Sequence, residues 1–140
     1  MNDRTFLDTN VFVYSFDPSS PSKARKADHL ISSAVESRKG IVSYQVVQEF
    51  FNLAFRRFEK PMSTSEASDY LAKVFRPLLS LHSSERLFAK ALQIFDAHHL
   101  SWYDSLIVAA AVESGCRILL TEDLNDGQRF GDTIVRNPFA

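Results

Sequence analysis

The chain has 140 residues, of which 45% are hydrophobic and 24% charged, with a net charge of −1, a composition typical of globular proteins. This length predicts a single domain over residues 1–140, and no apolar run approaches the roughly 20 residues that span a bilayer, which excludes a membrane protein. The only cysteine, Cys116, excludes an intramolecular disulfide and a cysteine-based metal cluster, and because no signal peptide is evident we expect a cytoplasmic protein.

In its first half the chain alternates between strand-like and helix-like segments. In chain order these are a strand at residues 5–7, a helix at 21–38, a strand at 41–42 and a helix at 44–58. Residues 11–16 could form a strand or a short helix, because periodicity does not decide over so few residues. Pro21 favours a helix start, since the amide that it lacks would be unpaired there, whereas Gly40 is expected to close that helix. Ser43 can cap the next helix.

The second half continues this alternation. In chain order we expect a helix at 64–76, a strand at 78–82, helices at 85–99 and 103–114, a strand at 117–121 and an edge strand at 133–136. Ser63 and Glu66 form a capping box that opens the helix at 64–76, and Pro77 breaks that helix. Gly115 ends the helix at 103–114. Short apolar strands between amphipathic helices predict an α/β fold with three layers, α/β/α, and a mostly parallel central sheet.

Five carboxylates stand at junctions between strand-like or loop segments and helix-like ones: Asp8, Glu49, Asp104, Asp123 and Asp126. Ligands bind outside the carboxyl ends of the strands in such sheets, and Asp8 and Asp123 lie just past two strand ends. Acids gathered in one pocket would repel each other, and a hard divalent cation such as Mg²⁺ or Mn²⁺ is the usual remedy. A metal that carboxylates hold with open coordination positions suits phosphoryl transfer. Setting the five aside leaves 12 acids against 16 bases, which is compatible with a polyanionic substrate.

Each acid also has an ordinary structural explanation. Asp8 could cap a turn or a helix, Glu49 could lie on the solvated face of an apolar helix, and Asp104 could interact with a helix dipole. Asp123 and Asp126 belong to a segment whose composition predicts a turn. The signals are stronger jointly, because four separate segments would each supply an acid to one rim.

Four motifs are distinctive in this order and at these spacings: LDTN at 7–10, SYQVVQE at 43–49, YDSLIVAAA at 103–111 and LTEDL at 120–124. Together they resemble the PIN domain family of metal-dependent ribonucleases, and particularly the small bacterial toxins of the VapC type, over essentially the whole chain. The resemblance implies a catalytic quartet that holds one or two Mg²⁺ or Mn²⁺ ions: Asp8, Glu49, Asp104 and Asp123. It also implies that Asp126 is a variable fifth metal ligand, and that Asn10 and Thr121 position water or the scissile phosphate.

The resemblance further implies an Mg²⁺-dependent endoribonuclease that cleaves RNA with a metal-activated water. It points to the toxin of a type II toxin–antitoxin system, to a homodimer, and to a cognate antitoxin that docks in an apolar groove. Four phenylalanines recur at helical spacings too wide for one buried face: Phe50, Phe51, Phe55 and Phe58. At least one of them, with Phe55 the chosen candidate, is therefore expected to line that groove.

Other functions stay open at this point. A PIN-family nuclease could have a housekeeping role or another nucleic-acid substrate, and a catalytically silent PIN-like domain could be a binding module. A haloacid-dehalogenase-like phosphatase would also place an aspartate after the first strand. That family needs a second aspartate two residues later, where this chain has Asn10, and a lysine before its later acids, which this chain does not supply.

Overall fold

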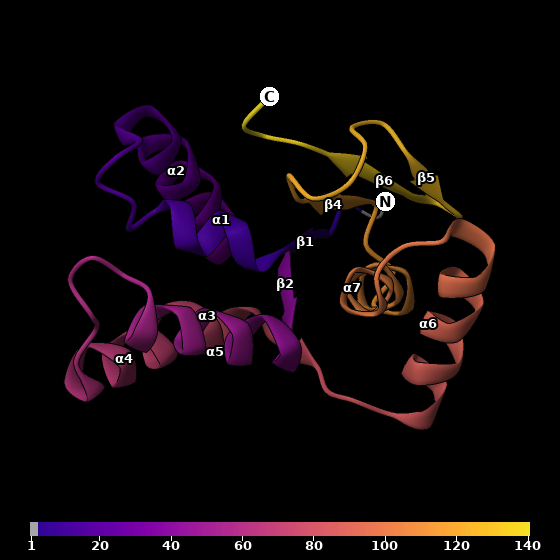
Figure 1. Cartoon of the computed structure of the whole chain (residues 1–140), viewed down its shortest axis with the longest axis horizontal. Helices are drawn as coiled ribbons and strands as arrows, with labels where there is room; N and C mark the ends of the chain where they lie inside the picture. Colours follow the sequence, from indigo (N-terminus) through magenta and orange to yellow (C-terminus); the bar gives the residue numbers. More distant parts are fainter. Residues whose placement is uncertain (1–2) are drawn as a thin grey trace.

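A six-stranded sheet in the order β3-β2-β1-β4-β6-β5 organises residues 3–140, the part of the chain that the computed structural model describes (Figure 1). Its strands are β1 (Thr5–Leu7), β2 (Gly40–Ser43), β3 (Leu79–Leu81), β4 (Ile118–Leu120), β5 (Arg129–Phe130) and β6 (Thr133–Arg136). All neighbouring strands pair in parallel except β5 and β6, which are antiparallel. The prediction of an α/β fold with a mostly parallel sheet is confirmed.

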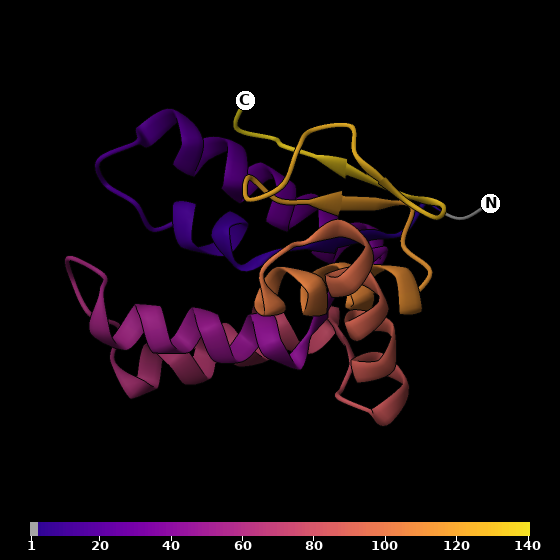
Figure 2. The ribbon, with the colours of Figure 1, turned by 45° about the vertical axis from the view of Figure 1, so that its right-hand side comes forward.

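Helices cover both sides of this sheet, with α2 on one side and α3 and α7 on the other (Figure 2). They are α1 (Thr9–Tyr14), α2 (Pro21–Ser37), α3 (Tyr44–Arg56), α4 (Thr64–Tyr70), a π-helical stretch η1 (Leu71–Phe75), α5 (Arg76–Leu78), α6 (Glu85–His98) and α7 (Trp102–Glu113). Among residues 3–140, no helix is both long and apolar enough to cross a bilayer.

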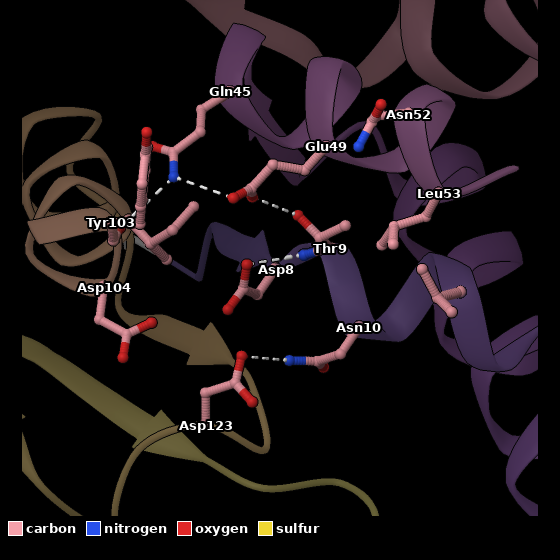
Figure 3. A pocket seen from close by; sticks show the side chains of 12 residues that line it. Asp8, Thr9, Asn10, Gln45, Glu49, Asn52, Leu53, Tyr103, Asp104 and Asp123 are labelled. Carbon is pink, nitrogen blue, oxygen red and sulfur yellow. Dashed lines mark hydrogen bonds between the residues drawn. The ribbon is translucent and has the colours of Figure 1, made fainter. Parts of the chain in front are cut away.

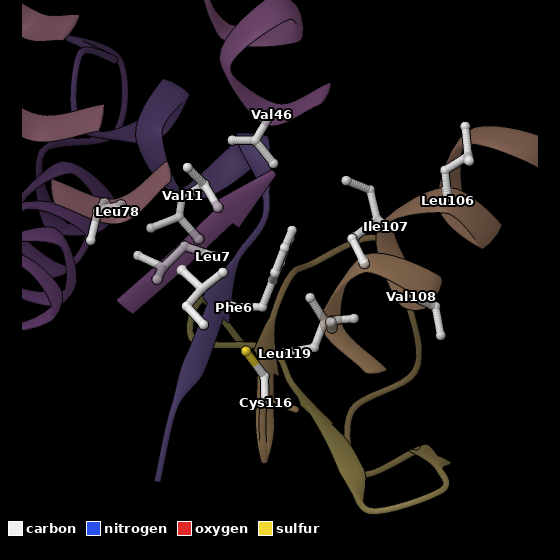
Figure 4. Packing of buried hydrophobic residues seen from close by; sticks show 14 of the residues in the cluster. Phe6, Leu7, Val11, Val46, Leu78, Leu106, Ile107, Val108, Cys116 and Leu119 are labelled. Atoms are coloured by element: carbon white, nitrogen blue, oxygen red, sulfur yellow. The ribbon is translucent and has the colours of Figure 1, made fainter. Parts of the chain in front are cut away.

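The core lies where the central strands meet α3 and α7. Phe6 of β1 and Leu119 of β4 are fully buried, and they lie near Val46 of α3 and Ile107 of α7 (Figure 4). Helix α7 is buried over seven consecutive residues, 105–111, which explains its nearly continuous apolar sequence. A helix enclosed in this way has little freedom to shift, so the core fixes the position of its N-terminal turn.

The ambiguous residues 11–16 belong mostly to α1, which begins at Thr9. Asp8 is its N-cap, and Asp8 Oδ1 accepts a hydrogen bond of 2.7 Å from the Thr9 amide. The capping box of Ser63 and Glu66 is also present, as predicted. Ser43 occupies the predicted N-cap position of α3 without a side-chain capping hydrogen bond.

The prediction that Gly40 closes α2 is wrong. The left-handed residue at the end of that helix is Arg38, with φ of 61°, whereas Gly40 lies inside β2. A Cβ atom on Gly40 would lie 2.5 Å from Cβ of Ala34 and 2.9 Å from Cδ2 of Leu78. Glycine is therefore needed here for the close approach of α2 to the sheet.

Gly40→Ala is expected to lower the free energy of unfolding by about 1–3 kcal/mol, because the new methyl group overlaps with α2. Denaturant unfolding would measure the loss. Adding Ala34→Gly removes the nearest overlapping atom, so the double variant should be less destabilised than the two single changes combined. Strictly additive losses would contradict the packing explanation.

Two further predictions about the second half need correction. Pro77 does not follow the helix but lies inside its last turn: α4 continues through the π-helical η1 into α5, which ends at Leu78, one residue after Pro77. Strand β6 is not at the edge of the sheet, because the two-residue β5 folds back on it through Gly131, which has φ of 61°. A strand of two residues is too short to leave a pattern in the sequence.

Candidate functional site

The parallel pairing of β1 with β4 brings together the two strand ends that carry acids. Leu7 lies beside Leu120, and the Asp8 amide donates a hydrogen bond of 3.0 Å to the Leu120 carbonyl oxygen. Asp8 and Thr121 therefore follow adjacent strands at the same edge of the sheet. This is the edge where ligands bind in open parallel sheets.

Four of the five candidate acids line one cavity of about 400 Å³ at this edge (Figure 3): Asp8, Glu49, Asp104 and Asp123. They come from the end of β1, the second turn of α3, the first turn of α7 and the turn after β4. Their carboxylates differ in accessibility, since Asp8 is 5% exposed, Glu49 and Asp104 are half-buried and Asp123 is exposed. The tertiary structure thus brings together acids that are up to 115 positions apart, counted from Asp8 to Asp123.

Asp8 and Thr121 form the buried centre of the site. Asp8 Oδ2 accepts a hydrogen bond of 2.8 Å from Thr121 Oγ1, and Thr121 is fully buried. The Thr121 hydroxyl also accepts hydrogen bonds from Asn10 Nδ2, at 3.2 Å, and from the Asp123 amide, at 3.1 Å. Because a hydroxyl has one proton to donate, Thr121 commits it to Asp8 and fixes the orientation of that carboxylate.

Asn10 connects α1 to the turn after β4. Its Nδ2 donates to Asp123 Oδ2 at 3.2 Å as well as to Thr121. Its Oδ1 is buried and has no hydrogen-bond partner among residues 3–140. A buried oxygen acceptor beside four carboxylates is a further hard ligand atom that a bound water or cation would satisfy.

Glu49 is held from two sides. Its Oε1 accepts a hydrogen bond of 2.8 Å from Thr9 Oγ1, and its Oε2 accepts a longer one, 3.5 Å, from Gln45 Nε2. Gln45 Nε2 also donates to the Tyr103 carbonyl oxygen at 3.4 Å. These contacts connect α1, α3 and α7 around the cavity. Sequence reasoning missed Gln45, although its spacing of four residues from Glu49 places both on one face of a helix.

Burial and mutual repulsion keep this cluster from carrying its full charge easily. Burial raises the pKa of Asp8 to about 7. The hydrogen bonds from Thr121 and Thr9 lower this pKa, whereas the negative charges of Asp123 and Glu49 add to the rise. Burial also raises the pKa of Asp104, with the hydrogen bond from Ser101 opposing and the charge of Asp123 adding to the rise. A divalent cation would offset both effects.

The chemistry of these side chains fits a hard cation, but their arrangement is not yet a coordination shell. Among the residues that the structure describes, no group of three or more His, Cys, Asp or Glu side chains could hold a metal ion as it stands. Glu49 is bonded to Thr9, and Asp123 to Asn10. Metal binding would therefore require these carboxylates to exchange their hydrogen bonds and turn towards Asp8.

Asp126 is not among the residues of this cavity. Its Oδ1 accepts a hydrogen bond of 2.9 Å from the Asn137 amide, so it holds the segment that follows β6. Only two residues lie between it and Asp123, and the direction of the turn places the two carboxylates apart.

A second, larger hollow of about 710 Å³ lies beyond the end of α1. Its apolar walls include Phe16, Phe58 and Met62. Of the four phenylalanines of the α3 region, Phe58 lines this hollow, and the antitoxin groove stays a prediction. Phe55, the candidate chosen from the sequence, is 43% exposed and stacks on Phe51, outside this hollow.

The model of the PIN domain matches residues 5–128 of the chain. No curated protein matches the sequence. Among solved structures, FitAcB from Neisseria gonorrhoeae is 21% identical over 96% of this chain and 98% of its own, with a TM-score of 0.68. A toxin–antitoxin complex from Klebsiella pneumoniae is 16% identical over 96% of this chain and 98% of the other, with a TM-score of 0.67.

VapC20 from Mycobacterium tuberculosis, a sarcin-ricin loop cleaving toxin, is 19% identical over 82% of this chain and 86% of its own, with a TM-score of 0.61. At these identities the solved structures show the fold alone. The family model shows which family the chain belongs to, because it covers most of the sequence and includes all four acids of the cavity. The chain therefore belongs to the PIN domain family.

Proposed function

We propose that this chain is an Mg²⁺-dependent endoribonuclease, the toxin of a type II toxin–antitoxin system acting on cytoplasmic RNA. The observation that carries the proposal is the convergence of four acids from four segments on one cavity, in a family whose members are typically metal-dependent nucleases. Solved structures of the same fold include toxins and toxin–antitoxin complexes. Cleavage of single-stranded RNA that requires both Mg²⁺ and Asp8 tests the proposal.

In this proposal Asp8 and Asp104 bind the cation directly, and Glu49 and Asp123 bind it directly or through water. Bound there, Mg²⁺ or Mn²⁺ supplies positive charge beside the scissile phosphate and lowers the pKa of a water nucleophile. Thr121 orients Asp8 through its hydroxyl, and Asn10 positions Asp123 and offers its Oδ1 to a bound water. We assign Asp126 to the C-terminal segment instead of the metal site.

The second hollow is the candidate site for the cognate antitoxin. Phe16 is 41% exposed and lines it together with Phe58, and the charged side chains Lys60 and Glu66 lie at its walls. Apolar walls with charged side chains among them suit an amphipathic helix, which buries its apolar face in a groove.

Phe16→Glu is expected to weaken antitoxin binding by about tenfold or more, because a carboxylate would be buried in the interface without a partner. Phe55→Glu is the matched control, since Phe55 is equally exposed, at 43%, but lies outside the hollow. Titration of each folded variant with the small protein encoded beside the toxin would measure the affinities. Equal losses in both variants would remove the hollow from the proposal.

A homodimer is supported by the outer face of α6. This helix packs against α7 and stands at the outer side of the molecule (Figure 1). Phe88, Leu92 and Phe95 follow each other at helical spacing on it and are 39%, 57% and 44% exposed. A row of exposed apolar side chains of this kind is typical of a surface that a second protein molecule covers.

One observation favours a second function, that of a catalytically silent binding module. The four acids do not form a ready coordination shell within residues 3–140. A silent domain would keep the fold and the cavity without gaining stability from Mg²⁺. The cleavage and metal-binding measurements described in the Discussion separate the two functions.

A further inference from the structure

The acid-lined cavity extends beyond the acids. Asp8, Asp104 and Asp123 lie together at one end of it, whereas Asn52 and Leu53 of α3 lie at the other, past Glu49 and Asn10 (Figure 3). Val13 of α1 also contributes to the walls. The neutral end of the cavity consists of three side chains that carry no charge: Asn52, Leu53 and Val13.

The two amide side chains that α3 contributes to the cavity, Gln45 and Asn52, differ in their hydrogen bonding. Gln45, Glu49 and Asn52 are spaced by four and three residues along α3, which places them on one face of the helix. Gln45 is engaged by Glu49 and by the Tyr103 carbonyl oxygen. The Asn52 side chain is exposed and makes no hydrogen bond to any residue within 3–140. Its donor and acceptor are both available to a ligand.

This combination of groups matches a nucleobase. Val13 and Leu53 are half-buried and offer apolar contact to the face of a ring, and the Asn52 amide offers a donor and an acceptor to its polar edge. A phosphodiester held at the acid end would place the neighbouring base within reach of the neutral end. The edge of a base presents an adjacent donor and acceptor that an asparagine amide can pair with in a bidentate manner, and the order of the two along the edge differs between bases.

We propose that the neutral end is a subsite for the nucleobase next to the scissile phosphodiester, and that Asn52 reads the edge of this base. The inference rests on the proposed nuclease function for its substrate class. It goes further by assigning the residue that sets base preference. The acids cannot distinguish one base from another, because in this proposal they contact only phosphate and metal.

Binding, measured apart from cleavage, tests the subsite. The wild-type protein, with Ca²⁺ in place of Mg²⁺ at the acid end, is titrated with fluorescent uridine heptanucleotides whose central position is A, C, G or U, and anisotropy gives the four dissociation constants. We expect the tightest and the weakest of the four probes to differ about tenfold in affinity, which is the discrimination of one bidentate amide–base contact. Adding Asn52→Ala should remove the preference. Adding Gln93→Ala, which changes an exposed amide on α6, should preserve it.

The outcomes are distinct. A base preference that Asn52→Ala removes and Gln93→Ala preserves supports the subsite. Equal affinity for the four probes, no binding, or a preference that survives Asn52→Ala overturns it, and the neutral end would then be a surface for a protein partner. Cleavage by the wild-type protein is scored separately: base-selective binding without cleavage would sink the nuclease function alone, and cleavage without selectivity would sink the subsite alone.

Discussion

Asp8→Asn is expected to reduce Mg²⁺-dependent cleavage of single-stranded RNA by about a thousandfold or more while leaving the protein folded. Asp8 is the most buried of the four acids, and hydrogen bonds from Thr121 and Thr9 fix the orientation of its carboxylate. Asparagine keeps the size of the side chain and removes the charge that would hold the cation. Cleavage of a fluorescent RNA by the purified protein, with Mg²⁺ and with EDTA, gives the rates.

The matched control is Asp132→Asn, which neutralises an exposed acid in the hairpin between β5 and β6, away from the cavity. Its cleavage rate should equal that of the wild type. Residual cleavage of equal size in wild type and Asp8→Asn would identify the activity as a contaminant. The silent binding module would then be the better description of this chain.

The second expected result concerns the stability of the metal-free protein. The pKa of Asp8 is about 7 in the folded state, above its ordinary value of 3.8, so the folded state binds this proton more tightly than the unfolded state. The resulting stabilisation is fully present below the unfolded pKa and is lost as the pH rises through the folded pKa. Between about pH 5 and about pH 8 it should fall by roughly 2–3 kcal/mol.

The Asp8→Asn variant has no titrating group at this position. Its free energy of unfolding should therefore rise relative to that of the wild type over that pH range when EDTA is present. Urea unfolding of both proteins at the two pH values measures this difference. Equal pH dependence of the two proteins would mean that Asp8 is already ionised at no cost in the folded state, and the argument from burial would fail.

Divalent metal should reverse the penalty in the wild type. A cation that binds only the folded state contributes about 2.7 kcal/mol at a concentration 100 times its dissociation constant, which raises the melting temperature of a domain of this size by several degrees. Mg²⁺ or Mn²⁺ should therefore stabilise the wild type at about pH 8 and have little effect on Asp8→Asn. No shift over millimolar metal would count against a shared metal site, in agreement with the lack of a ready coordination shell.

Much of the fold was predictable because its signals are local. The central strands β1 and β4 are short apolar runs, the capping box at Ser63 satisfies backbone groups within one turn, and the apolar run 106–111 has to be a buried helix. Gly40 and Pro77 were misinterpreted for the opposite reason. Their roles depend on the approach of α2 and on a π-helical turn, which are contacts and geometries that no local pattern encodes.

The sequence by itself determined which acids could act together, because Asp8, Glu49, Asp104, Asp123 and Asp126 each lie in or beside an element whose apolar pattern is clear. Only the tertiary structure decided which of the acids meet. Asp123 and Asp126 share one turn-forming segment, yet Asn10 bonds Asp123 while the Asn137 amide bonds Asp126. The reason is that β4 pairs with β1 on one side and with β6 on the other, so the turn after β4 passes from the site to the C-terminal segment within three residues.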